Sequence, residues 1–406
     1  MATHSTTTPY DDEAALMARP TAEISRLGSR SMMYGAAGVV LAIIGLFAAR
    51  EAWLLSYLVG YLFWSSITIG ALGLLMVHHL SGGAWGMVGR RVWEAATRTI
   101  PLLAVLFVPI AVNLPTLYSW ARPEAADDHL IHLKVAYLNV PFFLVRTVLF
   151  FVIWGALAFL LNKWSAQQDV DPAVGPGPLD RRFRLLSAPG LVLWVLTVTF
   201  MSVDWVMSVD PHWFSTIFGV LMIGNMGLST LAFTIIVLAS LVRFPPMSQV
   251  ANPDSFHDLG KLMLAFLMLW AYFAVSQLLI IWSANLPEEI PFYLERLTGP
   301  WASVSIALLV VQFVLPFLFL LSRDLKRNPA AVRRVAILIL VMRVVDTIWT
   351  VGPVFRHGST IHWLDFAMVL AIGCLWLPLF WRSLAGRSLV PARDPYFKEA
   401  MIHGGN

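Results

Sequence analysis

Four charged residues lie inside apolar segments that are each long enough to cross a bilayer: Arg146, Asp204, Arg343 and Asp346. A charge in the hydrocarbon costs about 2.5–3.5 kcal/mol on insertion scales, so each of these residues is a hypothesis about function. Arg343 and Asp346 are three residues apart and therefore share one face of a helix. Arg146 has no acid nearby on its own segment, but Asp204 on the next segment lies at a compatible depth. We therefore expect two buried Arg–Asp pairs.

Two interpretations of these pairs are open. They are either ion pairs that neutralise each other and fix the packing of helices, or a proton relay or quinone-facing polar cluster, because a carboxylate in a low dielectric can hold or release a proton near neutral pH. The two acids share a local pattern, Ser202-Val-Asp204-Trp in one segment and Val344-Val-Asp346-Thr in the other. We expect Asp204 and Asp346 at repeat-related positions, with their side chains pointing inward.

Other side chains could extend such a path. His78 and His79 are adjacent, so they point about 100° apart on a helix and at most one faces the bundle, as an interfacial residue or as a proton-entry group. Four amides could continue a polar path, or only cap and bridge helices: Asn113, Asn225, Gln277 and Asn285. The chain has a single cysteine, Cys374, and no readable pair of facing histidines, so no metal or haem centre is predicted in it.

The composition indicates which elements must position these residues. Hydrophobic residues make up 58% of the 406 and charged residues 13%, with a mean hydropathy of +0.72, whereas a soluble protein has about 45–50% and 25%. These values exclude a soluble protein and predict an all-α polytopic membrane protein, because backbone groups facing lipid must bond within their own helix. The net charge of +4 comes from short loops and does not indicate nucleic-acid binding.

Ten segments have the roughly 20 apolar residues that a span requires: 31–50, 53–78, 92–116, 138–162, 185–208, 214–242, 259–284, 300–322, 332–353 and 362–384. The longest predicted loop, 163–184, joins the fourth and fifth. Of the 28 Lys and Arg residues, 21 lie on the side of the N-terminus and five on the other side. This asymmetry predicts that both termini are cytoplasmic.

A faint internal repeat relates spans that are four apart. Ala111-Val-Asn113-Leu-Pro115 ends the third span, and Ser283-Ala-Asn285-Leu-Pro287 ends the seventh. The simplest arrangement is two parallel-repeated four-helix bundles, spans 2–5 and 6–9, plus two outer helices. The predicted organisation is an N-terminal tail (1–30), a first helix (31–52), two bundles (53–210 and 211–356), a tenth helix (357–385) and a C-terminal tail (386–406).

Four stretches are more specific than hydropathy. They are Ser202-Val-Asp204-Trp-Val-Met-Ser208-Val-Asp-Pro-His212-Trp-Phe-Ser215, Trp270-Ala-Tyr-Phe-Ala-Val-Ser-Gln277, Trp282-Ser-Ala-Asn285-Leu-Pro-Glu-Glu-Ile-Pro291 and Leu320-Leu-Ser-Arg323-Asp-Leu-Lys-Arg327. Together they resemble the ActF-type membrane subunit of bacterial alternative complex III, in the NrfD/PsrC-like family of quinone-interacting membrane proteins. The similarity covers nearly the whole chain from about residue 30.

The resemblance implies a subunit of a quinol:electron-acceptor oxidoreductase of the bacterial inner membrane, without a redox centre of its own. The implied partners are an ActC-like NrfD-family sister subunit, an extramembrane iron–sulfur/molybdopterin-like subunit, multihaem and monohaem cytochrome c subunits, small membrane subunits and membrane lipids. Haem c and iron–sulfur clusters then belong to those partners, and quinol or menaquinol binds nearby. In that family the quinol is oxidised mainly at the sister subunit, and the ActF-type chain is its structural twin and a candidate proton path.

Two alternatives stay open at this point. Ten helices, a repeat and buried charges also fit a secondary transporter, although no Gly/Pro-interrupted spans occur at corresponding positions. The chain could also bind and oxidise quinol itself.

Overall fold

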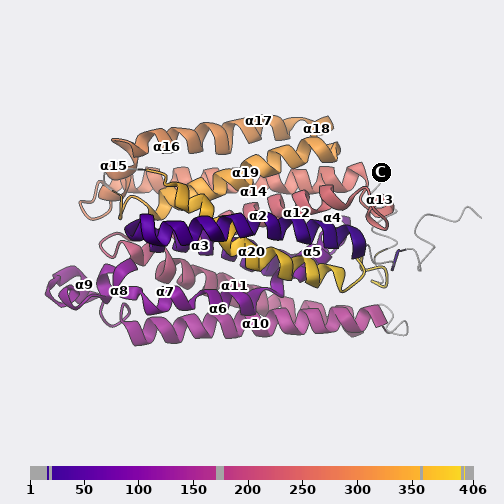
Figure 1. Ribbon diagram of the computed structural model, residues 1–406, viewed down its shortest axis with the longest axis horizontal. Helices are drawn as coiled ribbons and strands as arrows, with labels where there is room; N and C mark the ends of the chain where they lie inside the picture. The colour runs from indigo at the N-terminus through magenta and orange to yellow at the C-terminus, as the bar shows by residue number, and fades with distance from the viewer. Residues whose placement is uncertain (1–15, 18–20, 171–177, 357–359, 395–396, 398–406) are drawn as a thin grey trace, which may run out of the picture.

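The structure is a computed structural model that describes residues 16–17, 21–170, 178–356, 360–394 and 397. This part of the chain is helical throughout and contains no strand. The elements run side by side along the long axis of the molecule (Figure 1). In chain order they are α2 (Thr21–Ala48), α3 (Arg50–Ser81), α4 (Ala84–Met87), α5 (Arg90–Thr97), α6 (Ile100–Leu106), α7 (Val108–Val112), α8 (Leu114–Leu117), η1 (Ser119–Ala121), η2 (Pro123–Asp127), α9 (His129–Leu133), α10 (Val140–Val170), α11 (Pro178–Trp205), η3 (Met207–Val209), α12 (Phe218–Leu241), α13 (Met247–Val250), α14 (Pro253–Ala284), α15 (Pro291–Leu297), α16 (Trp301–Ala307), η4 (Leu308–Val314), α17 (Leu315–Leu321), α18 (Arg323–Arg327), α19 (Pro329–Val351) and α20 (Trp363–Ala385).

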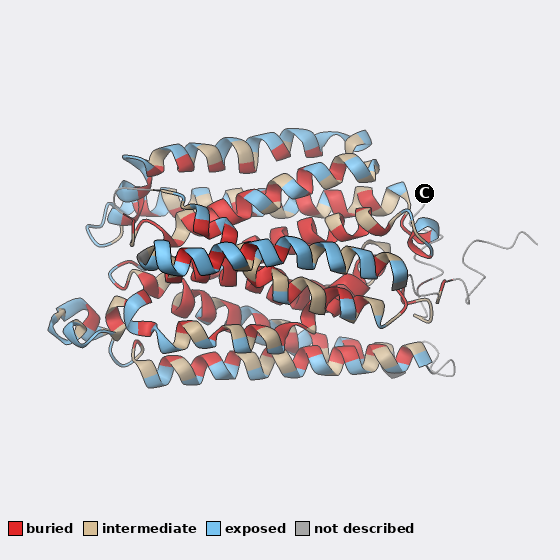
Figure 2. Cartoon of the chain, viewed as in Figure 1, coloured by how far each residue is buried: buried red, intermediate tan, exposed pale blue. Residues whose placement is uncertain are grey.

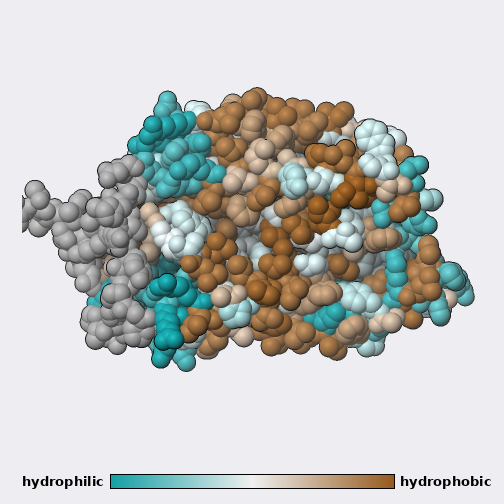
Figure 3. Space-filling view, turned by 180° about the vertical axis from the view of Figure 1, so that it is seen from behind, coloured by the Kyte–Doolittle hydropathy of each residue, from teal (hydrophilic) through white to brown (hydrophobic). Residues whose placement is uncertain are grey.

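Nine helical stretches of the described residues are long and apolar enough to cross a membrane: α2, α3, α5 to α7, α10, α11 with η3, α12, α14, α16 to α17, and α20. A broad band of apolar side chains covers the middle of the surface, between hydrophilic ends (Figure 3). The chain is therefore a multi-pass membrane protein. The ninth predicted span, 332–353, corresponds to α19, which is 23 residues long but is not among these nine, because it carries Arg333, Arg334, Arg343 and Asp346.

Two helices form the centre of the molecule. The membrane-length part of α3 is fully buried, and that of α12 is 83% buried. α3 packs against α5, α11, α12 and α20, and α12 also packs against α11, α14 and α19. Figure 2 shows that the outer helix α2, by contrast, is exposed along most of its length. Polar side chains on α3 and α12 are therefore held away from lipid.

The helix α2 is joined to the rest mainly through α20. Glycines on α2 let the two backbones approach closely: a Cβ on Gly35 would lie 2.5 Å from the Cα of Cys374, and one on Gly38 would lie 2.5 Å from the Cβ of Leu370. Small residues at such a seam permit the close van der Waals packing that joins helices in a bilayer.

One expectation about segment bounds is wrong. The predicted loop 163–184 is largely helical, since α10 continues to Val170 and α11 begins at Pro178; residues 171–177 lie outside the described residues. The reason is that Ser165, Gln168 and Asp169 of α10 have buried arginine partners, described below. The third predicted span, 92–116, is found as the apolar stretch Arg90–Val112. It is divided into short helices, and Pro101, Pro109 and Pro115 lie at the starts of α6, α7 and α8.

The two ends of the molecule differ in charge. We call the end that holds α4, α13 and α18 the basic end, and the end that holds η2, α9 and α15 the acidic end (Figure 1). The first predicted bundle, 53–210, corresponds to the elements α3 to η3. The second, 211–356, corresponds to α12 to α19.

Candidate functional site

The first pair joins two helices near the acidic end. Arg146 of α10 donates from Nε to Oδ2 of Asp204 at 2.8 Å and from Nη2 to Oδ1 at 2.9 Å. Asp204 is the second-last residue of α11 and is fully buried, and Arg146 is 6% exposed. This is the paired, fork-shaped geometry that arginine and carboxylate groups favour. The pairing expected from the sequence is present, and both side chains point inward.

Neighbouring groups also contact the guanidinium of Arg146. Its Nη1 donates to the carbonyl of Tyr137 at 3.0 Å. The guanidinium carbon lies 3.8 Å from the ring centre of Tyr137 and 4.2 Å from that of Phe142, a distance at which a cation is attracted to an aromatic face. The first pair is thus enclosed by fixed partners.

The second pair lies within a single helix. On α19, Nη1 of Arg343 lies 2.8 Å from Oδ2 of Asp346, and the two side chains are 3% and 5% exposed. With its side-chain amide turned so that the oxygen faces Arg343, the fully buried Gln312 of η4 accepts from the same Nη1 at 3.2 Å and donates to the carbonyl of Met342 at 2.9 Å. η4 is a π-helix, and Pro316, just after it, has no N–H to donate to the carbonyl of Gln312. Such widened turns often occur at functional sites.

A small cavity adjoins the second pair. It is lined by Arg343, Asp346 and Asn225 together with residues of α3, and its volume is about 10 Å³, measured over the positions open to the centre of a water-sized sphere. That is close to the smallest space that holds one water molecule. Among the described protein groups, neither Nε of Arg343 nor Oδ1 of Asn225 has a hydrogen-bond partner. The second pair therefore has donors and acceptors to spare at a point where α3, α12 and α19 meet.

The two histidines near the basic end point in different directions. His78 is 3% exposed and its ring lies against Trp85 and Trp93. The ring of His79 instead stacks on Phe183 of α11, with 4.3 Å between the ring centres. Both rings thus pack against neighbouring helices, that of His78 against α4 and α5 and that of His79 against α11.

The amides fall into two groups. Gln277 is buried, accepts from Oγ of Ser215 at 3.0 Å and donates to Oη of Tyr293 at 3.1 Å, so that it bridges α14 to two neighbouring segments. Asn113 and Asn285 are exposed. Asn113 donates to the carbonyl of Pro109 on its own helix, and Asn285 ends α14 in the left-handed conformation with φ 51°. Asn113 and Asn285 thus make the contacts that are usual for residues at the ends of helices.

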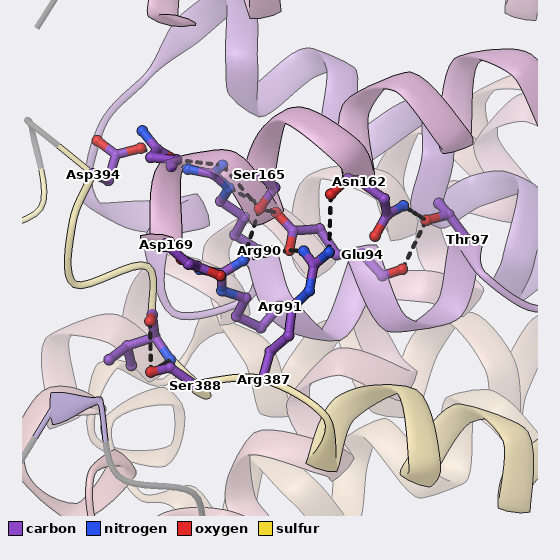
Figure 4. A network of polar contacts seen from close by, with 12 residues as sticks. Arg90, Arg91, Glu94, Thr97, Asn162, Ser165, Asp169, Arg387, Ser388 and Asp394 are labelled. Atoms are coloured by element: carbon purple, nitrogen blue, oxygen red, sulfur yellow. Dashed lines mark hydrogen bonds and ion pairs between the residues drawn. The ribbon is translucent and has the colours of Figure 1, made fainter. Parts of the chain in front are cut away.

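A larger buried polar network occupies the basic end (Figure 4). Glu94 of α5 is 2% exposed and pairs with Nε of Arg90 at 2.9 Å and Nη1 of Arg91 at 2.7 Å. Oγ of Ser165 on α10 donates to Glu94 at 2.7 Å, and Arg91 also pairs with Asp169. We did not single out these residues from the sequence, because Arg90 and Arg91 look like ordinary loop cations at the end of an apolar segment. The available signal was an acid three and four residues after them.

The same network holds the segment after α20. Nη1 of Arg90 pairs with Asp394 at 2.6 Å, and Nη2 of Arg387 donates to the carbonyl of Asn162 at 3.0 Å. Burial lowers the pKa of Arg387 to about 10. Residues 387–394, predicted as part of the tail, are therefore attached to α5 and α10.

A third ion pair that the sequence did not reveal lies at the acidic end. Arg356 donates to both oxygens of the fully buried Asp365, at 2.7 and 2.8 Å, and Oγ of Ser56 donates to the same carboxylate at 2.6 Å. Asp365 also accepts from the backbone N–H of His362 and so closes a capping box at the start of α20. Because Asp365 caps α20, the pair of Arg356 and Asp365 is explained by a structural role and requires no catalytic one.

No three His, Cys, Asp or Glu side chains come together as a metal site would require, within the residues described. The chain matches no protein-family model, and a comparison with curated proteins finds no relative.

Proposed function

We propose that this chain is an integral membrane subunit of a quinol:cytochrome c-type oxidoreductase complex, without its own redox centre, and that it provides part of a proton path. The sequence motifs around Asp204, Gln277 and Asn285 support the family, as set out above. In this proposal α19 is also a span, the ninth of ten, both termini are cytoplasmic and the membrane is the bacterial inner membrane. The excess of Lys and Arg at the basic end supports this orientation.

The packing of helices supports a structural twin with two related bundles. α11 lies against α3 in the first half, and α19 lies against α12 in the second. Likewise α10 contacts α6 and α11, as α17 contacts α14 and α19. Under this correspondence Asp204 on α11 and Asp346 on α19 occupy related helices.

The observation that carries the proton path is the cavity beside Arg343 and Asp346. A carboxylate carries a proton only if it can change partners, and this cavity brings Asn225 and room for a water molecule to the carboxylate. Hydroxyl side chains continue along α12 toward the basic end, from Ser229 to Thr230 and Thr234. The indole N–H of Trp93, next to His78, donates to Oγ1 of Thr234 at 2.9 Å. A path from His78 to Asp346 would follow this interface between α3 and α12.

The first test is purification of the chain from its native membrane. We expect it to copurify with haem c and iron–sulfur signals and with quinol-oxidising activity. An isolated chain that binds and exchanges a small solute would contradict the proposal and favour a secondary transporter. A quinone photolabel attached to this chain would instead favour quinol oxidation at this subunit.

The second test concerns the path itself. In the assembled complex, Asp346→Asn is expected to lower quinol-driven proton release while quinol oxidation continues. Gln277→Leu is the matched control, because Gln277 is an equally buried polar residue away from the cavity. Wild-type proton release from a normally assembled Asp346→Asn complex would end the relay interpretation.

A further inference from the structure

A long groove runs along the outside of the molecule between α6–α7 and α10. It consists of two adjoining hollows of about 440 and 480 Å³, which share Ile100, Pro101 and Gly155 as lining residues. On α10 the groove extends from Leu144 to Lys163. At 1.5 Å per residue these 19 steps cover about 28 Å, close to the roughly 30 Å of the hydrocarbon core of a bilayer.

One end of the groove is basic. Arg98, Lys163 and Arg387 line it at the basic end of the molecule, together with Thr97 and Asn162. Among the described residues, Arg98 and Lys163 have no carboxylate within the 4.0 Å of an ion pair. Arg98 instead donates from Nε to Oδ1 of Asn162 at 2.8 Å.

The nearest acid does not neutralise this end. Glu94 is engaged at short distance by Arg90 and Arg91, and its Oε2 lies 3.8 Å from Nη1 of Arg387. Asp169 is likewise paired with Arg91. The end of the groove therefore carries a surplus of positive charge at the level where lipid phosphates lie.

The rest of the groove is apolar and is kept open by a glycine. Its lining residues include Phe107, Val148 and Phe151. A Cβ placed on Gly155 would meet nothing within 4 Å, so the absence of a side chain there leaves free space along α10. Positive charge at one end and an uninterrupted apolar channel beyond it match the two parts of an anionic lipid.

We infer that this groove binds an anionic phospholipid, with its phosphate at Arg98, Lys163 and Arg387 and one acyl chain along α10 past Gly155. Basic pockets between membrane helices select anionic head groups in this way. A zwitterionic lipid would bring its ammonium group among three cations and is disfavoured. The inference does not depend on the proposed respiratory role, because it uses only the groove and its charges.

The test measures lipid bound to the full-length protein, in its complex if it has one. The protein is purified in mild detergent, and retained lipids are counted by native mass spectrometry after addition of phosphatidylglycerol or phosphatidylcholine. We expect the wild type to retain phosphatidylglycerol in preference to phosphatidylcholine. The double variant Arg98→Gln/Lys163→Gln should bind phosphatidylglycerol about thirty-fold more weakly. Arg382→Gln, an exposed cation on α20 outside the groove, should have no effect.

The acyl chain is tested separately. Gly155→Leu fills the groove without a clash and should reduce retention, whereas Ala156→Leu, at the next and exposed position, should not. Equal retention of the two lipids, or undiminished retention by both the double variant and Gly155→Leu, would overturn the inference. So would an experimental structure in which a quinone tail or the helix of another subunit fills the groove.

Discussion

The two buried Arg–Asp pairs use the same residue types in different ways. Arg146 reaches from α10 to Asp204 on α11 through two hydrogen bonds, whereas Arg343 meets Asp346 on its own helix at a single short distance. Aromatic rings cover the first guanidinium, while the second pair borders a cavity.

The difference separates a structural pair from one suited to exchange. Asp204 has both oxygens committed to one partner on another helix, so its main effect is to hold α10 and α11 together. Asp346 holds no second helix through Arg343, and its neighbours include an amide with an unused acceptor. Asp204 and Asp346 are equivalent in residue type and in burial, but the geometry of their hydrogen bonds differs.

The largest effect is expected for Asp204→Asn. Removing the charge leaves Arg146 buried without its counter-ion, which should cost about 3–5 kcal/mol of stability. Thermal unfolding and the yield of folded protein in detergent measure this loss. Replacing both members, Arg146→Met with Asp204→Leu, should restore much of it, since an apolar pair of similar volume strands no charge. Unchanged stability of the single variant would show that the pair does not hold the two helices.

A smaller loss is expected for Asp346→Asn. The amide can still accept from Arg343, and Gln312 remains as a second acceptor, so the cost should be that of one charged hydrogen bond, about 1.5–3 kcal/mol. The same unfolding measurement applies, with Asp204→Asn as the reference. If Asp346→Asn were the more destabilising of the two, the assignment of roles to the pairs would be reversed.

Asn225→Leu, unlike the two substitutions above, is expected not to lower the stability of the protein. A buried carbonyl without a partner costs about 1–3 kcal/mol, so replacing this amide by an apolar side chain should leave the stability unchanged or raise it by about 1 kcal/mol. Proton release by the complex should nevertheless fall toward that of Asp346→Asn. Wild-type proton release from an assembled Asn225→Leu complex would show that the cavity is not a point of exchange.

The smallest effect is expected for an exposed pair at the acidic end, where Nε2 of His212 lies 2.7 Å from Oδ2 of Asp128. The hydrogen bond from His212 holds the pKa of Asp128 below its ordinary value of 3.8. Because the folded pKa is the lower one, this contribution to stability is present above pH 3.8 and is lost as the pH falls through the folded value. His212→Gln should slightly weaken the dependence of the free energy of unfolding on pH, and unfolding curves recorded between pH 5 and pH 2 measure this change. A steep change would mean that the loops at this end are coupled to the buried pairs.

The charges that the sequence revealed and those that it hid differ in position along the segments. Asp204 and Asp346 stand out because apolar residues surround them on both sides, and the pairing of Arg146 followed from depth alone. Glu94 and Asp365 lie near the ends of apolar segments, where charges usually meet water. Each also has a serine partner that is far away in sequence, Ser165 for Glu94 and Ser56 for Asp365, and the sequence does not reveal these contacts.

The helices, too, were predictable where apolar residues dominate a segment and not where polar residues do. Long apolar segments identify most of the spans, but hydropathy does not show that α10 continues to Val170, because its last turns are polar and gain their partners from α5. It also does not show that α19 packs against the two central helices, α3 and α12. The fully buried stretch of α3 has a lower mean hydropathy than α16 to α17, of which only 28% is buried, so hydropathy alone does not identify the central helices.

The glycine seam between α2 and α20 has a consequence for biogenesis. A ribosome makes α2 first among these helices and α20 last, and the seam includes positions as far apart as Gly35 and Cys374. Throughout synthesis of the intervening chain, α2 has inserted without the partner that its glycines fit. The seam between α2 and α20 therefore forms only after α20 has been synthesised.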